Sequence, residues 1–253
     1  MVAVRRRQPD PSRLSYGHDV RYRFVDCRWD LTDPGRGYEL YRAGHIPGAV
    51  FLDVDADLSD LTVKGAGRHP LPSARGFAAA ASRAGIEDGV FVVAYGNMGG
   101  AERLWWLLRH FGHSECGVLL GGIESWGGAL RAGVDEVEPT TFVPRERSGD
   151  TIGADEIVDR RDELVVVDAR LPSRWRGEDN PIDKVPGRIP GARNAPWNES
   201  LPELPDGELA VYCGSGVTAS AVVHRLWLAG REARLYPGSW SQWETLGLPV
   251  ERD

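Results

Sequence analysis

The stretch that decides the fold is Leu209-Ala210-Val211-Tyr212-Cys213-Gly214-Ser215-Gly216-Val217-Thr218. It opens with a short apolar run of the kind that forms a buried parallel strand. A helix-like segment, Ala219 to Ala229, follows the glycines. Ligands bind at the carboxyl ends of the strands in an open parallel sheet. This order therefore predicts that Cys213 lies at the edge of a sheet where active sites form.

The loop after Cys213 favours a negatively charged sulfur. Glycines permit backbone angles closed to other residues, so successive N–H groups can point at one atom and form an anion-binding nest. The start of the following helix adds about half a positive charge. We predict that this loop stabilises a Cys213 thiolate, or the outer sulfur of a persulfide, with hydrogen bonds added by the Ser215 and Thr218 hydroxyls. The alternative is an inert cysteine at a strand end. The residues expected to bind the substrate sulfur through the loop are Gly214, Gly216, Val217 and Thr218.

Other readings of the three cysteines are weaker. Cysteine-dependent phosphatases have a related loop, but they need an arginine six residues after the cysteine, where this chain has Ala219. Cys27 follows a strand and is expected to be partly exposed, and Cys116 lies in a helix-to-strand connection. Neither has a donor-rich loop after it. The nucleophile is therefore assigned to Cys213.

The chain repeats itself once. The spacing agrees between the halves, since Trp126 lies 31 positions after Tyr95 and Trp243 lies 31 positions after Tyr212. Repeated landmarks in the same order indicate two homologous domains. The matching pairs are Phe24–Arg28 with Val166–Arg170, Gly44–Ala49 with Gly187–Ala192, Val93–Gly96 with Ala210–Cys213, and Gly122–Trp126 with Ser239–Trp243.

We expect two α/β domains, each a parallel sheet with helices on both faces, because strands alternate with helix-like segments in both halves. The first domain, 1–137, lacks the nucleophile, since Gly96 stands where the second half has Cys213. The stretch 138–150 holds prolines and charges without an apolar period and is predicted to be a linker. The second domain, 151–253, carries the predicted site.

Composition limits the possible partners. The net charge of −7 argues against a general nucleic-acid or anionic-membrane binder. No run of 18 apolar residues suggests a membrane helix. Three widely spaced cysteines fit a reducing compartment and show no zinc-ligand spacing. We therefore expect a cytoplasmic protein without a bound metal.

The repeated landmarks resemble the tandem-domain rhodanese family, which includes thiosulfate sulfurtransferases and 3-mercaptopyruvate sulfurtransferases. The resemblance runs from Asp26 to Trp243. It implies two rhodanese-like domains, with the active site in the second and a non-catalytic copy in the first. The motifs that carry it, besides the Cys213 loop, are Gly44–Ala49, Gly67–Pro72, Arg103–Arg109 and Gly238–Trp243.

The loop type indicates the sulfur donor. Thiosulfate enzymes of the family look like Cys-Arg-Lys-Gly-Val-Thr, whereas mercaptopyruvate enzymes look like Cys-Gly-Ser-Gly-Val-Thr. Cys213 to Thr218 is of the second type. A neutral loop has less to offer a doubly charged thiosulfate, while an arginine further out can hold a single carboxylate. The resemblance therefore implies 3-mercaptopyruvate as donor.

Arg174 is the candidate for holding that carboxylate. Ser173–Glu178 is similar to the family's Arg-aromatic-x-Gly substrate segment, and a guanidinium can bind a carboxylate through two parallel hydrogen bonds. The alternative is a surface salt bridge. The second arginine that mercaptopyruvate enzymes often carry is missing here, or is shifted to Lys184 or Arg188. Arg188 also replaces the family's usual histidine in Gly-His-Ile-Pro-Gly-Ala.

The resemblance also implies a Ser-His-Asp relay that is proposed for some family members. By motif match its residues are Ser215, His69 and Asp55, so the catalytic set is these three with Cys213. The alternative for His69 is a partly buried packing residue.

The predicted reaction is sulfur transfer. The Cys213 thiolate attacks the sulfur of 3-mercaptopyruvate and releases pyruvate, and the persulfide then passes its sulfur to a thiol such as thioredoxin, or to cyanide. No metal or organic cofactor is implied. Two alternatives stay open: a thiosulfate sulfurtransferase, and a persulfide-carrying regulatory module with little turnover.

Overall fold

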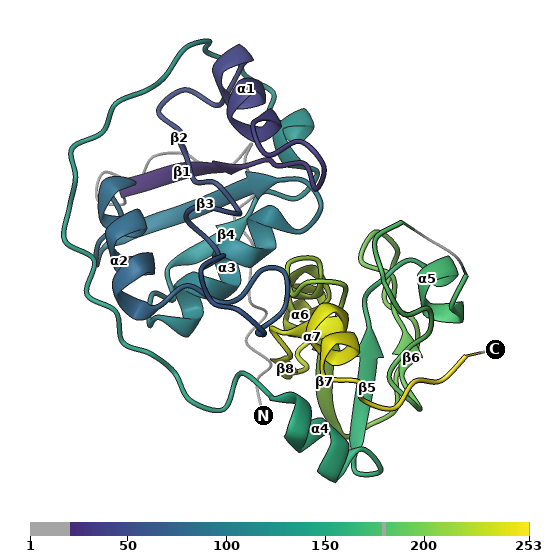
Figure 1. Ribbon diagram of the computed structural model, residues 1–253. Helices are drawn as coiled ribbons and strands as arrows, with labels where there is room; N and C mark the ends of the chain where they lie inside the picture. Colours follow the sequence, from purple (N-terminus) through teal and green to yellow (C-terminus); the bar gives the residue numbers. More distant parts are fainter. Residues whose placement is uncertain (1–20, 179–180, 253) are drawn as a thin grey trace. The chain divides into compact units, whose positions relative to one another are not determined.

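The computed structural model describes residues 21–178 and 181–252 (Figure 1). The predicted first domain begins within residues 1–20, which lie outside the described residues, as do 179, 180 and 253. Contacts divide the described chain into two compact units. Unit 1 runs to Asp57 and continues over Ala74–Glu146, and unit 2 consists of Leu58–Ser73 and the chain from Arg147 onward.

Unit 1 holds a four-stranded parallel sheet in the order β2-β1-β3-β4. The apolar runs of β1 and β3 pair along their whole length, from Arg21 with Val90 to Cys27 with Gly96. The strands are β1 (Arg21–Cys27), β2 (Val50–Phe51), β3 (Val90–Gly96) and β4 (Cys116–Val118). The helices are α1 (Arg36–Ala43), α2 (Ala74–Arg83), α3 (Gly100–His110) and the short 3₁₀ helix η2 (Gly122–Ser125).

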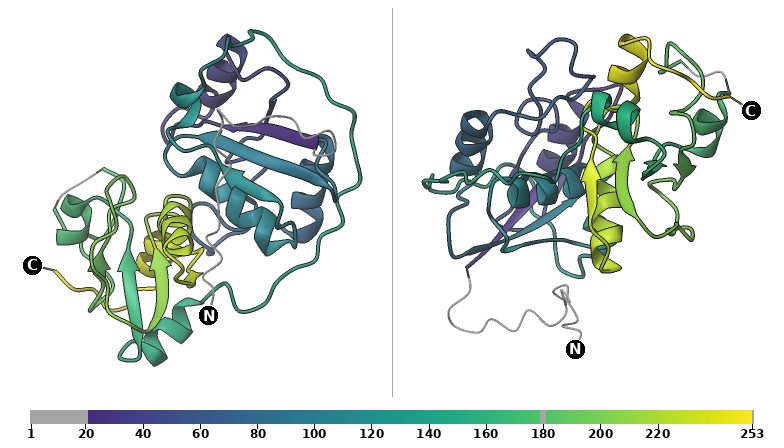
Figure 2. Two further views of the ribbon diagram at one scale, coloured as in Figure 1. Left: turned by 180° about the vertical axis from the view of Figure 1, so that it is seen from behind. Right: turned by 90° about the horizontal axis from the view of Figure 1, so that it is seen from below.

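Unit 2 repeats this topology in the order β6-β5-β7-β8, again with every pair parallel. Figure 2 shows both sheets from two further sides. The strands are β5 (Leu164–Asp168), β6 (Arg193–Asn194), β7 (Glu208–Tyr212) and β8 (Ala233–Leu235). The helices are α4 (Ala154–Arg160), α5 (Pro172–Arg176), α6 (Ala219–Leu228) and α7 (Ser239–Thr245). The predicted strands and helices on either side of Cys213 are confirmed.

Helices cover both faces of the first sheet. Side chains alternate between faces along a strand. Cys116 is paired with Val92, and its sulfur lies 3.9 Å from the Trp105 carbonyl of α3. On the opposite face, Phe24 packs edge-to-face on Trp126, directly after η2, with ring centroids 5.5 Å apart. The predicted arrangement, a parallel sheet with helices on both faces, is confirmed.

Aromatic residues build the core beside the sheet of unit 2. Trp240 and Trp243 of α7 are fully buried against Tyr212 and Tyr236. Burying such large apolar surfaces stabilises the start of α7 by several kcal/mol, at about 25 cal/mol per Å². Because Tyr212 immediately precedes Cys213, this core fixes the strand end from which the cysteine projects.

Two segments belong to a unit because of the contacts that they make, and not because of their position in the sequence. Phe142, in the predicted linker, packs edge-to-face on Phe77 of unit 1, and Thr140 N–H donates to the Ser82 carbonyl over 2.9 Å. The segment 58–73, which follows β2 in sequence, belongs by contacts to unit 2.

Cys27 differs from the sequence-based expectation. It was predicted to be partly exposed, but it is the last residue of β1 and is fully buried. The expectation was wrong because the strand continues through Cys27, which pairs with Gly96.

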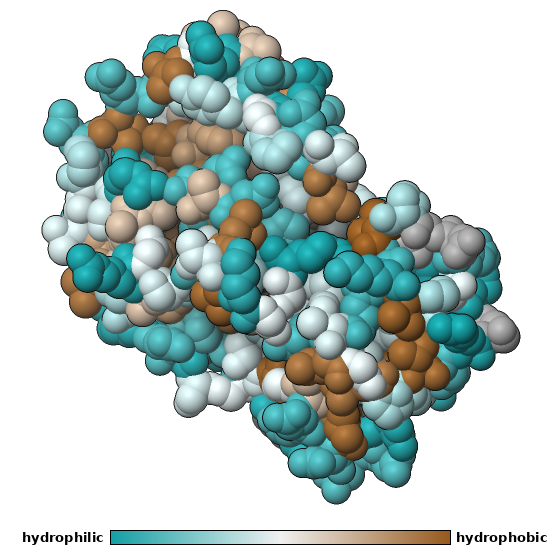
Figure 3. Space-filling view, viewed as in Figure 1, coloured by the Kyte–Doolittle hydropathy of each residue, from teal (hydrophilic) through white to brown (hydrophobic). Residues whose placement is uncertain are grey.

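The face of the molecule in Figure 3 carries hydrophobic residues in separate patches among hydrophilic ones. No helix among the described residues is long and apolar enough to span a membrane.

Candidate functional site

Cys213 lies directly after β7, at the carboxyl end of a central strand. Gly216 N–H donates a hydrogen bond to its sulfur over 3.1 Å. Gly216 has φ +90°, and a Cβ atom there would collide with the Pro237 carbonyl oxygen. The left-handed conformation that turns this N–H onto the sulfur is therefore accessible only to glycine. The loop thus places a hydrogen-bond donor where a thiolate or persulfide would carry its charge.

The start of α7 holds the backbone of the loop in place. Cys213 N–H donates to Ser239 Oγ over 3.1 Å, and Trp240 N–H donates to the Cys213 carbonyl over 2.9 Å. Ser241 N–H donates to the Gly214 carbonyl over 3.0 Å. Gly238–Trp243 is one of the motifs that carry the family resemblance, and no role in the site was predicted for it. Its signal was the Ser-Trp-Ser pattern, whose hydroxyl and backbone groups fix the cysteine loop.

Arg174, the predicted carboxylate-binding residue, reaches the loop from α5. Its Nε and Nη2 donate to the two oxygens of Asp183 over 2.7 and 2.5 Å. A Cβ atom on Gly214 would lie 2.6 Å from Nη2 and 3.2 Å from Nη1 of this guanidinium. Arg174 is thus both salt-bridged and placed against the loop. Nε and Nη2 of its guanidinium bind Asp183, and both Nη2 and Nη1 lie beside Gly214.

Arg68 is a second cation at the loop and was not among the predicted site residues. It lies in the segment 58–73, and a Cβ atom on Gly214 would be 2.7 Å from its Nη2. Its Nη1 lies 3.9 Å from Asp183 Oδ1. The sequence signal for it was the motif Gly67–Pro72, of which only His69 was predicted to take part in the site.

Asp183 is the carboxylate at the centre of this cluster. Its side chain is 1% exposed, and Arg170, itself fully buried against Asp168 and Trp240, donates to it over 3.2 Å. Burial alone would raise the pKa of Asp183. Hydrogen bonds from Arg174, together with the charges of Arg170 and Arg68, instead lower that pKa below its usual value. Asp183 is therefore ionised and orients the arginines.

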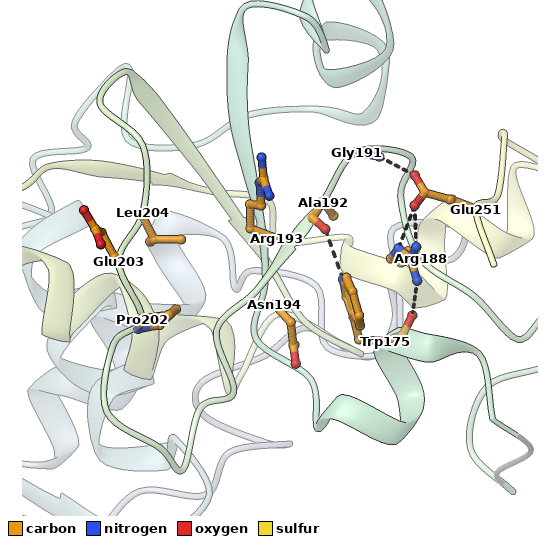
Figure 4. Close-up of a pocket in the computed structure, with 10 residues that line it drawn as sticks. All are labelled: Trp175, Arg188, Gly191, Ala192, Arg193, Asn194, Pro202, Glu203, Leu204 and Glu251. Atoms are coloured by element: carbon orange, nitrogen blue, oxygen red, sulfur yellow. Dashed lines mark hydrogen bonds and ion pairs between the residues drawn. The ribbon is translucent and has the colours of Figure 1, made fainter. Parts of the chain in front are cut away.

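Arg188, predicted as a substrate-binding residue, contacts residues outside the cysteine loop. It forms an ion pair with Glu251, lies with its guanidinium carbon 4.0 Å from the Trp175 ring centroid, and donates to the Trp175 carbonyl (Figure 4). Glu251 also accepts the Gly191 N–H over 2.7 Å. These contacts explain Arg188 as the residue that fastens its own turn to the C-terminal segment.

A pocket of about 550 Å³ opens beside this ion pair (Figure 4). Its wall includes Trp175, Arg188 and the edge strand β6, with Pro202 and Leu204 on the other side. Cys213 is not among the lining residues. Lys184, the other predicted position for a second cation, is exposed, and its backbone N–H donates to Glu244 over 2.8 Å.

The remaining predicted residues fall in both units. Ser215 is 7% exposed on the cysteine loop, Val217 is fully buried, and Thr218 precedes the first residue of α6. His69 is buried in unit 2, next to Arg68 in sequence. Asp55 belongs by contacts to unit 1. The relay through Asp55, His69 and Ser215 stays a prediction.

The other two cysteines have surroundings that disfavour a thiolate. Burial, followed by the charge of Asp26, raises the pKa of Cys27 well above its usual value. Burial raises the pKa of Cys116 to about 12. Within residues 21–178 and 181–252, no cluster of histidine, cysteine and acidic side chains has the makings of a metal site.

The chain is similar to known proteins along most of its length. The profile of the Rhodanese-like domain matches residues 14–129 and 153–246. A "Putative thiosulfate sulfurtransferase SseB" from Mycobacterium tuberculosis H37Rv is 36% identical over 250 residues, covering 87% of both chains. A "Probable 3-mercaptopyruvate sulfurtransferase" from Pseudomonas aeruginosa is 39% identical, covering 87% of this chain and 88% of the relative. The solved 3-mercaptopyruvate sulfurtransferase from Leishmania major superposes with a TM-score of 0.79 at 28% identity, covering 94% of this chain and 74% of that one.

Proposed function

Because the chain belongs to the rhodanese-like domain family and is a sulfurtransferase, we propose that it takes sulfur from 3-mercaptopyruvate onto Cys213 and passes it to a thiol or to cyanide. The observation that carries the proposal is the loop itself. Its Gly216 N–H points at the Cys213 sulfur, residues 214–218 bring no charged side chain, and the Arg174 guanidinium lies against Gly214.

The first half-reaction forms the persulfide. The Cys213 thiolate attacks the sulfur of 3-mercaptopyruvate and forms an S–S bond, while the donor's C–S bond breaks. The electron pair of that bond stays with the carbon as pyruvate enolate, which takes up a proton and becomes pyruvate. Arg174 binds the donor carboxylate, and the Gly216 N–H stabilises the charge on sulfur. We assign delivery of the proton to the proposed relay of Ser215, His69 and Asp55.

The second half-reaction empties the site. An acceptor thiolate attacks the outer sulfur of the persulfide, forms a new persulfide on the acceptor, and returns Cys213 as a thiolate. We propose a dithiol protein such as thioredoxin as acceptor, because its second thiol then releases the sulfur as sulfide and leaves a disulfide. Such an acceptor, and three free cysteines in this chain, fit a cytoplasmic location.

Thiosulfate is the second candidate donor, and one observation favours it. The guanidinium of Arg68 joins that of Arg174 at Gly214, which gives the loop more positive surroundings than its neutral sequence suggests. One relative is also named a putative thiosulfate sulfurtransferase. We rank mercaptopyruvate first because Asp183 already compensates part of this charge, which suits a monoanion better than a dianion.

The test is a side-by-side measurement of kcat/KM for the two donors with cyanide as the common acceptor. We expect the value for 3-mercaptopyruvate to be at least about 10-fold higher, equivalent to about 1.4 kcal/mol of transition-state binding. A preference for thiosulfate would overturn the choice of donor and leave the Cys213 chemistry intact. Failure of both donors to turn over would refute the proposed function.

A further inference from the structure

We propose that the pocket beside the edge strand β6 binds a zwitterionic ligand with an apolar body, such as an amino acid or a short peptide. This edge pocket has a volume of about 550 Å³, and its lining residues, which come from α5, β6, the segment 202–204 and the turns around Arg188 and Glu251, all belong to unit 2 (Figure 4). Small-molecule sites typically have volumes of about 300–1,000 Å³. The inference does not depend on the sulfur donor or acceptor.

Two opposite charges in the wall of the edge pocket are not used by the protein itself. Arg193 of β6 and Glu203 both line the pocket, and both are exposed. Neither side chain forms an ion pair or a hydrogen bond with another residue of the described chain. The other charged pair in the wall, Arg188 and Glu251, is satisfied internally. The edge pocket therefore offers one cation and one carboxylate, which match the carboxylate and the ammonium group of a zwitterion.

Trp175 gives the edge pocket an aromatic wall that is fixed in position. Its indole Nε1–H donates to the Ala192 carbonyl over 3.0 Å, and the guanidinium carbon of Arg188 lies 4.0 Å from its ring centroid. The ring is half-buried, so part of its surface stays accessible. Because the ring is already held, an apolar group that packs on it costs little side-chain entropy.

The opposite wall is also held in place without a ligand. Arg231, which follows α6, donates to the Leu204 carbonyl over 3.1 Å and to the Pro205 carbonyl over 2.5 Å. These bonds fix the segment 202–205, whose Leu204 and Glu203 side chains line the pocket. In Figure 4 this segment lies on the other side of β6 from Trp175. A ligand that lies across β6 can therefore contact both walls.

Asn194 adds a hydrogen-bond acceptor between the two walls. Its Nδ2 donates to the carbonyl oxygens of Asp168 and Arg170 over 3.0 and 2.9 Å. Because both partners are acceptors, the amide turns its nitrogen toward them and its oxygen away. That oxygen accepts no hydrogen bond from the described parts of the chain. It can therefore accept one from an ammonium group or a peptide N–H of a ligand.

The edge pocket is separate from the cysteine loop. Asn194 of β6 pairs with Asp168 of β5, which in turn pairs with Tyr212 of β7, the residue before Cys213. Two strand spacings, together about 10 Å, therefore lie between β6 and β7. Cys213 is not among the residues that line the pocket. A ligand bound there would leave the thiol of Cys213 accessible.

The competing explanation is that the exposed charges only protect the edge of the sheet. Charged side chains on an edge strand prevent it from pairing with other chains. In that case Arg193 and Glu203 would serve solubility, and the pocket would not distinguish a zwitterion from an uncharged molecule of the same shape.

The experiment is isothermal titration calorimetry of the full chain with L-leucine, L-leucyl-L-leucine and N-acetyl-L-leucine amide. The first two are zwitterions, and the third has the apolar body without the charges. We expect at least one zwitterion to bind with a Kd below about 1 mM, and the uncharged probe to bind at least about 10-fold more weakly. Tighter binding of the dipeptide would identify a peptide as the ligand, and otherwise the ligand is a free amino acid.

Two results with these probes would overturn the proposal. One is that neither zwitterion binds with a Kd below about 1 mM, and the other is that the uncharged probe binds as tightly as the zwitterions.

Arg193→Met and Glu203→Gln test whether the zwitterion binds in the edge pocket. Both side chains are exposed, so both variants should fold. Each should weaken the binding of the tighter zwitterion at least about 10-fold. The matched control is Glu199→Gln, because Glu199 is exposed nearby in the sequence and does not line the pocket. Its affinity should match wild type, whereas an unchanged affinity in Arg193→Met or Glu203→Gln would contradict the assignment.

Alkylation of Cys213 provides the last control. With the tighter zwitterion at saturation, the rate of alkylation by iodoacetamide should stay within about 2-fold of the rate without it. Protection of Cys213 would place the ligand at the cysteine loop, and the proposed site would be wrong. Cys213→Ser should bind the zwitterion with the same Kd as wild type, so a failure of the proposed sulfur transfer would leave this result unaffected.

Discussion

The loops after β3 and β7 occupy equivalent places in the two units, yet only one is equipped to carry sulfur. Both have a left-handed glycine at the same position, Gly99 with φ +80° and Gly216 with φ +90°. The first loop has Gly96 where the second has Cys213, and it leads into α3 after residues 97–99, whereas residues 213–218 precede α6. The shared glycine therefore serves the fold, and the sulfur chemistry depends on Cys213 and the longer loop that follows it.

The residue after the nucleophile position shows the same contrast. In unit 1 it is Asn97, whose side-chain amide accepts the Trp29 N–H over 2.9 Å and donates to the Trp29 carbonyl over 3.1 Å. In unit 2 it is Gly214, and two guanidiniums lie against it. The first loop is closed by two bonds from Asn97 to the backbone of Trp29, which follows β1, while the second leaves room for cations. A sulfur-carrying loop therefore needs a residue without a side chain after its cysteine, so that cations can approach, as much as it needs the cysteine itself.

The largest expected effect comes from removing the one feature that only the second loop has. Cys213→Ser should lower the rate of pyruvate release from 3-mercaptopyruvate by at least about 10⁴-fold, because no other group in the loop can form the S–S bond. Cys116→Ser, measured alongside, should stay within about 2-fold of wild type. Substantial residual turnover in Cys213→Ser would break the comparison.

The next largest expected effect is a difference in alkylation rate between Cys213 and the other two cysteines. Because burial raises the pKa of Cys116 to about 12, its thiol stays protonated below that pH. At pH 8 its thiolate fraction is roughly 10³-fold smaller than that of an ordinary cysteine. Iodoacetamide at pH 8 should therefore label Cys213 in the native protein and reach Cys27 and Cys116 only after denaturation. Peptide mass spectrometry measures this, and labelling of Cys116 as fast as Cys213 would contradict it.

A moderate effect on stability is expected from placing a cysteine in the first loop. A Cβ atom at Gly96 would lie 2.8 Å from the Cys27 carbonyl oxygen and 3.2 Å from Ala101 N. Gly96→Cys should therefore lower the free energy of unfolding by about 1–3 kcal/mol, and it should not restore activity to Cys213→Ser. Gly35→Ala is the control, because its nearest neighbour would be an Asp33 oxygen at 3.9 Å. Restored turnover would show that the nucleophile alone suffices.

The smallest effect on activity is expected at Arg188, the counterpart of His45. His45 lies 3.3 Å from Asp135, which accepts the Gly48 N–H, and Arg188 pairs with Glu251, which accepts the Gly191 N–H. Arg188→His should lower stability by about 1–2 kcal/mol and leave the KM for 3-mercaptopyruvate within about 2-fold. A KM raised about 10-fold would assign Arg188 to substrate binding after all.

The sequence predicted the cysteine loop itself better than the distant residues that contact the loop in the folded chain. The apolar run before Cys213 and the glycines after it reported the strand, the turn and the donor loop, because each depends on neighbouring residues. Arg68 escaped prediction because its place depends on a tertiary contact: residues 58–73 follow a strand of unit 1 but pack on α7. The burial of Cys27 was mispredicted for a related reason, since only the strand pairing with Gly96 shows that β1 continues through it.

Sulfur transfer through Cys213 is tested most directly by the mass of the protein after brief exposure to 3-mercaptopyruvate without an acceptor. Wild type should gain the mass of one sulfur atom, the sulfur should lie on the peptide containing Cys213, and cyanide should remove it. Cys213→Ser should gain nothing. Sulfur found on Cys27 or Cys116, or retained by Cys213→Ser, would contradict the assignment of sulfur transfer to the second loop.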